Sequence, residues 1–170
     1  MKRFRIPIMK NTWSLLLLIW SGAIFAGDLP DPVRTPGGIN PDVTQENIDE
    51  TICVPGWTKT IRPPSSYTNK LKKRQIVEYG FTDTDTSNYE EDHLISLQLG
   101  GNPRDPKNLW PQTYFGVCNA RVKDMLETKL KRLVCDGTIS LQEAQQAIAT
   151  NWVAAYVEYV NEAGCPVSYQ

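Results

Sequence analysis

The most informative segment of the sequence runs from Tyr89 to Gln112 and reads YEEDHLISLQLGGNPRDPKNLWPQ. It contains His93, the only histidine among the 170 residues. Acidic residues precede the histidine, apolar residues follow it, and a Gly100-Gly101 turn then leads through a polar loop to Asn108-Leu-Trp110. Because paired glycines and clustered polar residues mark turns between extended segments, the pattern predicts a strand, a loop, a short strand and then a helix.

The histidine is flanked by the carboxylates of Glu91 and Asp92. Imidazole is the side chain best suited to accept a proton near neutral pH, and a carboxylate is a preferred ligand of hard cations such as Mg²⁺. Cleavage of a phosphodiester needs both a base that activates water and a means of stabilising negative charge on oxygen. Because negative neighbours favour the charged imidazole, we expect Glu91 and Asp92 to raise the pKa of His93.

The ordered set Asp92-His93, Gly100-Gly101, Asn108-Leu109 and Asn119 with Lys123 resembles the motif of HNH endonucleases. About 35 residues carry the motif itself. A weaker resemblance to secreted bacterial HNH-like proteins continues through Lys123–Glu127 and Ser140–Gln145 to the C-terminus. The resemblance implies the ββα-metal fold, in which a β-hairpin and a helix form the site.

Carried over by position, the resemblance implies four roles. His93 removes a proton from water, Asp92 binds one divalent cation, Asn108 braces the hairpin loop and Asn119 is the second metal ligand. The last histidine of the family motif is replaced here by Asn119, which also stands where a helix N-cap would stand, so ligand and cap are equal alternatives. The expected cation is Mg²⁺, with Mn²⁺ or another divalent ion as alternatives.

The side of the strand on which each acid lies leaves a second alternative open. Neighbouring residues of a flat strand point to opposite faces, so Asp92 and His93 address one phosphate only if the strand bends. In a regular strand Glu91 shares the face of His93 and becomes the alternative ligand. Four basic residues near the motif are the expected phosphate contacts: Arg104, Lys107, Arg121 and Lys123.

Helices are expected on both sides of the motif. Apolar residues at helical spacing predict one helix from Asn119 to Val134, ended by Asp136-Gly137, and the capping-box pattern at Ser140 predicts that another begins there. A third is expected from about Tyr67 to Tyr79 and carries clustered lysines and an arginine, interpreted as a solvated face in preference to a phosphate-binding patch.

The N-terminal residues indicate export. Residues 1–26 combine four basic residues, a short apolar run and a final Ala23-Ile-Phe-Ala26, which is typical of a cleaved signal peptide. Residues 27–50 are rich in Pro and Gly and are expected to form an acidic arm that is extended or loosely packed, with Thr51–Pro55 as a short edge strand. The expected location is secreted or periplasmic, without membrane contact after cleavage.

The cysteines Cys53, Cys118, Cys135 and Cys165 are even in number and contain no CxxC pair, which predicts two disulfides. A continuous helix after Cys118 keeps it far from Cys135. If the next helix runs antiparallel, Cys165 returns toward Cys118. The favoured pairs are therefore Cys53 with Cys135 and Cys118 with Cys165.

These observations predict an α+β domain over residues 51–170: a ββα-metal hairpin-plus-helix site packed with additional helices and two disulfides. The expected function is metal-dependent endonucleolytic hydrolysis of DNA, with RNA as the alternative substrate. The alternative is a secreted binding or structural module on an HNH scaffold that has lost turnover. After removal of the leader the chain has a net charge of about −5, which neither predicts nor excludes a nucleic-acid partner.

Overall fold

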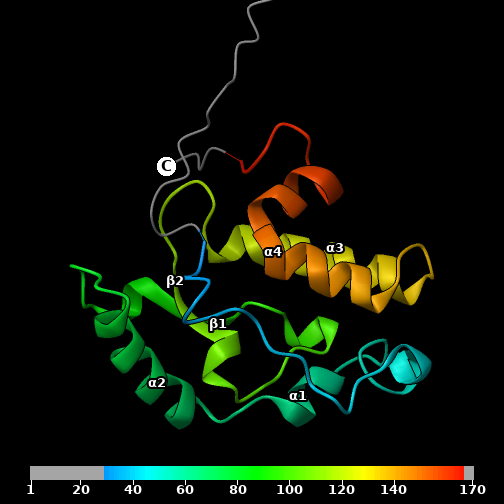
Figure 1. Ribbon diagram of the computed structural model, residues 1–170, viewed down its shortest axis with the longest axis horizontal. Coiled ribbons are helices and arrows are strands. Elements are labelled where there is room, and N and C mark those ends of the chain that lie inside the picture. The colour runs from blue at the N-terminus through cyan, green and yellow to red at the C-terminus, as the bar shows by residue number, and fades with distance from the viewer. Residues whose placement is uncertain (1–28, 167–170) are drawn as a thin grey trace, which may run out of the picture.

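The computed structural model describes residues 29–166, so the expected signal peptide lies outside the described residues. The chain forms two strands and several helices, in an α+β arrangement (Figure 1). The elements are α1 (Trp57–Ile61), α2 (Ser65–Glu78), β1 (Tyr89–His93), β2 (Leu109–Thr113), α3 (Ala120–Cys135) and α4 (Leu141–Tyr159). Short 3₁₀ turns occupy Gln45–Glu50, Thr86–Asn88, Leu97–Leu99 and Pro106–Asn108. Within residues 29–166 no helix is both long and apolar enough to cross a membrane.

The strands β1 and β2 form an antiparallel hairpin with an unbroken one-to-one register. His93 pairs with Leu109, Asp92 with Trp110 and Glu91 with Pro111. Because successive side chains of a regular strand point to opposite faces, His93 and Glu91 lie on one side of the hairpin and Asp92 on the other. The strand is therefore regular, and the bend that would bring Asp92 and His93 to one face is absent from Tyr89–His93.

The hairpin lies between α2 on one side and the α3–α4 pair on the other (Figure 1). On the α2 side, Gln75 donates a hydrogen bond to the carbonyl of Leu109. On the other side, Trp110 is fully buried in a core formed mainly with α3 and α4. That core contains Leu126, Leu130, Ile148, Trp152 and Tyr156. The hairpin thus presents one face to each helical layer.

The ends of α3 and α4 follow the sequence closely. The side chain of Asn119 accepts hydrogen bonds from the amides of Arg121 and Val122, and the hydroxyl of Ser140 accepts one from Glu143. These bonds satisfy amides of the first turns that have no helical partner. The backbone of α4 leaves helical geometry at Asn151, whose side chain accepts from the amide of Ala154 and so caps the second part of the helix.

The N-terminal arm differs from the expectation. It packs against the loop that joins β1 and β2: the amide of Gly37 donates to the carbonyl of Lys107, and the amide of Asn40 donates to that of Gly100. Thr35 and Val43 are buried there, and Gln45–Glu50 forms a 3₁₀ turn. The prediction of a loosely packed arm was wrong because backbone groups of the arm pair with those of the loop.

The expected edge strand at Thr51–Pro55 is also absent. The amides of Thr51 and Cys53 both donate to the carbonyl of Ile48, which closes a turn. The apolar side chain of Ile52 is fully buried within that turn. Thr51–Pro55 contains apolar residues because Ile52 packs into the core. Its backbone hydrogen bonds are made within the turn and not to a neighbouring strand.

Both disulfides form with the expected pairing, Cys53 with Cys135 and Cys118 with Cys165. The second bond joins the residue before α3 to the segment after α4, which confirms that these helices run antiparallel. The first bond joins the turn before α1 to the last residue of α3. The described residues contain no unpaired cysteine.

Candidate active site

His93 is the last residue of β1, and its imidazole is held by the loop that follows. Its Nε2 lies 3.1 Å from the carbonyl oxygen of Pro103. A carbonyl can only accept, so Nε2 carries the proton in the neutral ring and Nδ1 carries the lone pair. The hydrogen bond therefore both orients the ring and selects the tautomer whose Nδ1 can accept a proton.

The pKa of His93 is lowered to about 4. Burial is the main cause, since only 6% of the residue is exposed; the bond to Pro103 opposes the shift, and the cations Lys123 and Arg62 add to it. The expectation that neighbouring acids raise this pKa was wrong. Asp92 lies on the other face of the strand, and loss of water around the ring outweighs the negative charges nearby.

Two polar hollows meet at His93. A cleft of about 290 Å³ is lined by the first turn of α2 together with Arg62, Lys72, Glu91 and Tyr114. A small cavity of about 70 Å³ is lined by Arg62, Glu90, Asp92, Asp124 and Glu127. Arg62 and Glu90 line both of them. A larger groove of about 620 Å³, between the N-terminal arm and α4, has neither a charged residue nor His93 in its lining.

Arg62 is the site residue that sequence reasoning missed. It is exposed and follows α1 directly, before Pro63-Pro64 and the start of α2. The sequence feature that could have identified Arg62 is its position just before the start of a helix. The first amides of a helix and a guanidinium both bind anions, so the two together indicate an anion site. That signal is weak in the sequence alone, because nothing there relates Arg62 to His93, which lies 31 residues later.

Lys123 and Asp92 form a buried ion pair beneath the hairpin. The Nζ of Lys123 lies 2.7 Å from Oδ2 of Asp92 and 2.6 Å from Oε1 of Glu127. It also donates to the backbone carbonyl of His93 at 2.8 Å. The other carboxylate oxygen of Glu127 accepts from the hydroxyl of Ser96. This arrangement ties α3 to the end of β1.

The charges of this cluster depend on one another. Burial raises the pKa of Asp92, and the ammonium of Lys123 opposes that rise. Burial by itself lowers the pKa of Lys123, but the carboxylates of Asp92 and Glu127 raise it by more, so its net pKa lies above the ordinary value. Lys123 therefore stays positively charged, and it forms ion pairs with the carboxylates of Asp92 and Glu127.

Glu91 faces the same cleft as His93. Burial raises its pKa to about 8, with Lys72 opposing the shift. Both carboxyl oxygens are inaccessible and have no hydrogen-bond partner among the described residues. At neutral pH Glu91 is thus a largely protonated acid beside the imidazole.

Asn108 braces the loop between the strands, as the resemblance implies. It is fully buried, and its Oδ1 accepts from the amides of Ile95 and Gly38, while its Nδ2 donates to the carbonyls of Ile95 and Asn102. The four bonds hold the two ends of the loop and the N-terminal arm together. The loop carries Pro103, so Asn108 supports the position of the His93 ring.

The two expected metal ligands do not fit a cation together. The Asp92 carboxylate faces Lys123, and the side chain of Asn119 is engaged at the start of α3, where its Oδ1 caps two amides and its Nδ2 donates to the carbonyl of Gly116. In the part of the chain that the structure describes, no three His, Cys, Asp or Glu side chains are grouped as metal ligands. Of the two alternatives for Asn119, the structure shows the cap.

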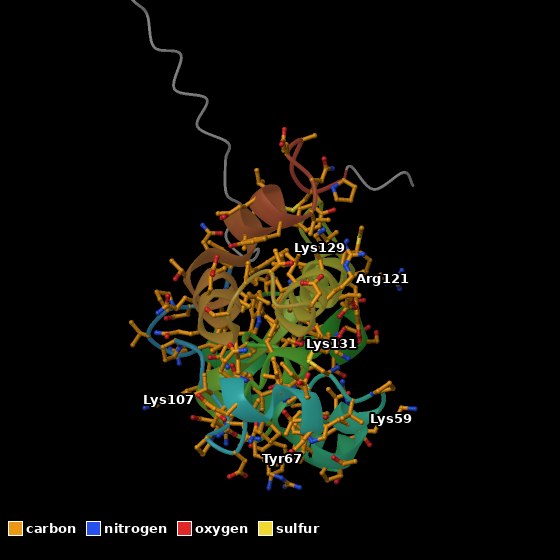
Figure 2. All side chains as sticks on the ribbon, turned by 90° about the vertical axis from the view of Figure 1, so that its right-hand side faces the viewer. Lys59, Tyr67, Lys107, Arg121, Lys129 and Lys131 are labelled. Carbon is orange, nitrogen blue, oxygen red and sulfur yellow. A yellow bond between two sulfur atoms is a disulfide. The ribbon has the colours of Figure 1, made fainter. Side chains whose placement is uncertain are left out.

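The four expected phosphate contacts lie in different places. Arg104 is exposed and lies over the ring of Tyr67, next to Pro103. Arg121 lies over Tyr114, which lines the cleft. Figure 2 shows Lys107 on the opposite side of the molecule from Arg121. Lys123 does not fit the expected role, because it is fully buried and its ammonium is engaged by two carboxylates and a carbonyl.

Comparisons with known proteins add no relative: no family model matches the chain, and no match was found among the curated proteins or the solved structures.

Proposed function

We propose that this chain is an exported nuclease that hydrolyses the phosphodiester bonds of DNA, with RNA as the alternative substrate, and that His93 is its general base. The observation that carries the proposal is the hydrogen bond from Nε2 of His93 to Pro103, which leaves Nδ1 as a proton acceptor beside a cleft lined by cationic groups. The resemblance of the motif to HNH endonucleases supports the same reaction.

In this proposal water bound in the cleft gives its proton to Nδ1, and the resulting hydroxide attacks phosphorus in line with the leaving oxygen. The imidazolium that forms is stabilised by its bond to the carbonyl of Pro103. The leaving oxygen takes its proton from water in the cleft, because both carboxyl oxygens of Glu91 are inaccessible to a substrate.

The phosphate would be held by Arg62 and by the start of α2. Arg62 lines both hollows at His93 and can bind two phosphate oxygens at once. The first turn of α2 has no side-chain cap, and the amides at the start of a helix attract anions. Together they provide positive potential without a contribution from Lys123.

The adjoining face of α2 would hold the rest of the polyanion. A hollow beside the cleft is lined by Ser66, Asn69, Lys70, Lys73 and Arg74, and the three cations are exposed. A row of exposed cations next to a polar cleft suits a chain of phosphates better than one small substrate. From the sequence alone, the basic face of α2 was interpreted as a solvated face. Because it lies beside the cleft, a phosphate-binding patch is now the preferred interpretation.

Export is proposed from the leader-like residues 1–26 and from the two disulfides, which persist in oxidising compartments. A second candidate function, a binding module without turnover, is favoured by one observation: the carboxylate expected to hold a metal is paired with Lys123.

The test is cleavage of plasmid and of single-stranded oligonucleotides by the purified protein, with its disulfides intact, compared with His93→Gln. We expect the variant to lose at least about 100-fold in rate, the usual contribution of a general base. Glu162→Gln, at an exposed position that lines neither hollow at His93, is the control and should keep full activity. Because His93 is buried, unfolding curves must accompany the rates. Nucleic-acid binding without cleavage in the unaltered protein would favour the binding module.

A further inference from the structure

The ammonium of Lys123 has the surroundings of a bound metal cation. Its three neighbours are all oxygens: carboxylates of Asp92 and Glu127 and the backbone carbonyl of His93, at 2.6 to 2.8 Å. Carboxylates and backbone carbonyls are the ligands that hard cations take in proteins. The ammonium donates hydrogen bonds to the carbonyl of His93 and to Glu127, and it forms an ion pair with Asp92.

The position of this charge is fixed by burial. Lys123 is fully buried, and Asp92 and Glu127 are 8% and 6% exposed. Two carboxylates at such a place repel each other and lack water, so a cation between them stabilises their charged forms. The residue that supplies it comes from α3, and Ser96 holds the remaining oxygen of Glu127.

The ammonium of Lys123 is also linked to His93 through a backbone hydrogen bond. Lys123 donates to the carbonyl of His93 itself, while the ring of His93 is held separately by Pro103. Lys123 therefore fixes the end of β1 from one face, and the loop fixes the imidazole from the other. It touches neither the cleft lined by the start of α2 nor the small cavity, so it acts as a positioning residue.

We propose that Lys123 is a built-in cation: it takes the place of a divalent ion between Asp92 and Glu127, and the site is assembled without a metal. Only the link to catalysis rests on the proposed function. The occupancy of the cation position is a separate property that binding and unfolding measurements report by themselves.

The experiment compares the unaltered protein with Lys123→Ala, which removes the ammonium and keeps both carboxylates. Titration calorimetry and thermal unfolding are recorded with Mn²⁺, with ethylammonium, and with tetramethylammonium, which has the charge but no proton to donate. Lys131→Ala, a partly buried lysine on the same helix, is the matched control.

We expect the unaltered protein and the control to show no saturable Mn²⁺ binding and no shift of the unfolding midpoint. Lys123→Ala should unfold at a lower temperature and should be restabilised by Mn²⁺ and ethylammonium but not by tetramethylammonium, with an affinity for Mn²⁺ at least about tenfold above that of the unaltered protein. If the variant does not fold alone, recovery of the folded signal on adding Mn²⁺ or ethylammonium is the supporting result.

The proposal is overturned by stoichiometric Mn²⁺ binding to the unaltered protein that disappears in Asp92→Asn. It is equally overturned if Lys123→Ala, folded or not, responds to neither Mn²⁺ nor ethylammonium. Because none of these readouts uses nucleic acid, an inactive protein would weaken the proposed function and leave the built-in cation standing.

Discussion

At the scale of single residues, the environment of His93 decides which chemistry it can do. The sequence places two acids before it, which suggested a raised pKa. In the fold those acids divide between the faces of β1: Asp92 pairs with Lys123, and Glu91 is itself buried. Burial then lowers the pKa of the imidazole. The result is a neutral base at physiological pH, which suits proton abstraction better than a charged imidazolium would.

Glu91 makes a prediction about stability and pH. Its pKa is 4.5 in an exposed chain and about 8 in the fold, so the folded state holds its proton more tightly. Its contribution to stability is therefore complete below pH 4.5 and is lost as the pH rises toward 8. Glu91→Gln cannot ionise and should avoid this loss. We expect its free energy of unfolding, relative to the unaltered protein, to rise by about 1–3 kcal/mol across that window.

Denaturant unfolding at several pH values measures this difference. Glu50→Gln, at an exposed position, reports the effect of removing one surface carboxylate. A difference between Glu91→Gln and the unaltered protein that stays constant with pH, or falls as pH rises, would show that Glu91 is ionised in the fold.

At the scale of elements, the helices were predictable and the segments between them less so. The helices expected at Tyr67–Tyr79 and Asn119–Val134 appear as α2 and α3 with small shifts of their ends. Their caps and apolar spacing are local signals. The turn at Thr51–Pro55 was not predicted, because an apolar run that packs within a turn has the same composition as a short edge strand. The packed arm was not predicted, because its hydrogen bonds join residues far apart in the sequence, such as Gly37 and Lys107.

The loop between β1 and β2 depends on two residues. Gly101 is required because a Cβ there would lie 1.7 Å from the carbonyl oxygen of Ile95. Asn108 makes four hydrogen bonds to backbone groups of Ile95, Gly38 and Asn102. The motif identified both positions, and their role in the loop follows from contacts that the fold supplies.

Asn108→Ala should therefore destabilise the protein by about 3–5 kcal/mol, because several buried backbone groups lose their partners at once. The measurement is chemical denaturation, with Asn69→Ala, an exposed asparagine on α2, as control. A loss below about 1 kcal/mol would mean that the loop holds its shape without Asn108.

At the scale of the whole molecule, the disulfide pairing was predictable from the sequence, whereas the contacts between the helical layers and the hairpin were not. The pairing of the cysteines was predicted from helix length and an antiparallel return, and both bonds form. The burial of Lys123 was not predicted. The sequence indicated a phosphate contact at this position, and only the packing of α3 under the hairpin turns Lys123 inward, toward Asp92 and Glu127. The spacing of apolar residues along one helix does not reveal contacts of this kind between a helix and a strand.

The whole fold holds His93 as a neutral base, with α2 and the loop after β1 on one side of it and α3 on the other. Because it is the only histidine, nitrogen NMR of histidine-labelled protein observes this single ring through a pH titration. In the folded protein we predict the tautomer protonated at Nε2 at neutral pH and a pKa of about 4, which returns to about 6.5 when the chain is unfolded in denaturant. A folded-state pKa at or above 6.5, or a proton on Nδ1 in the neutral ring, would contradict the account.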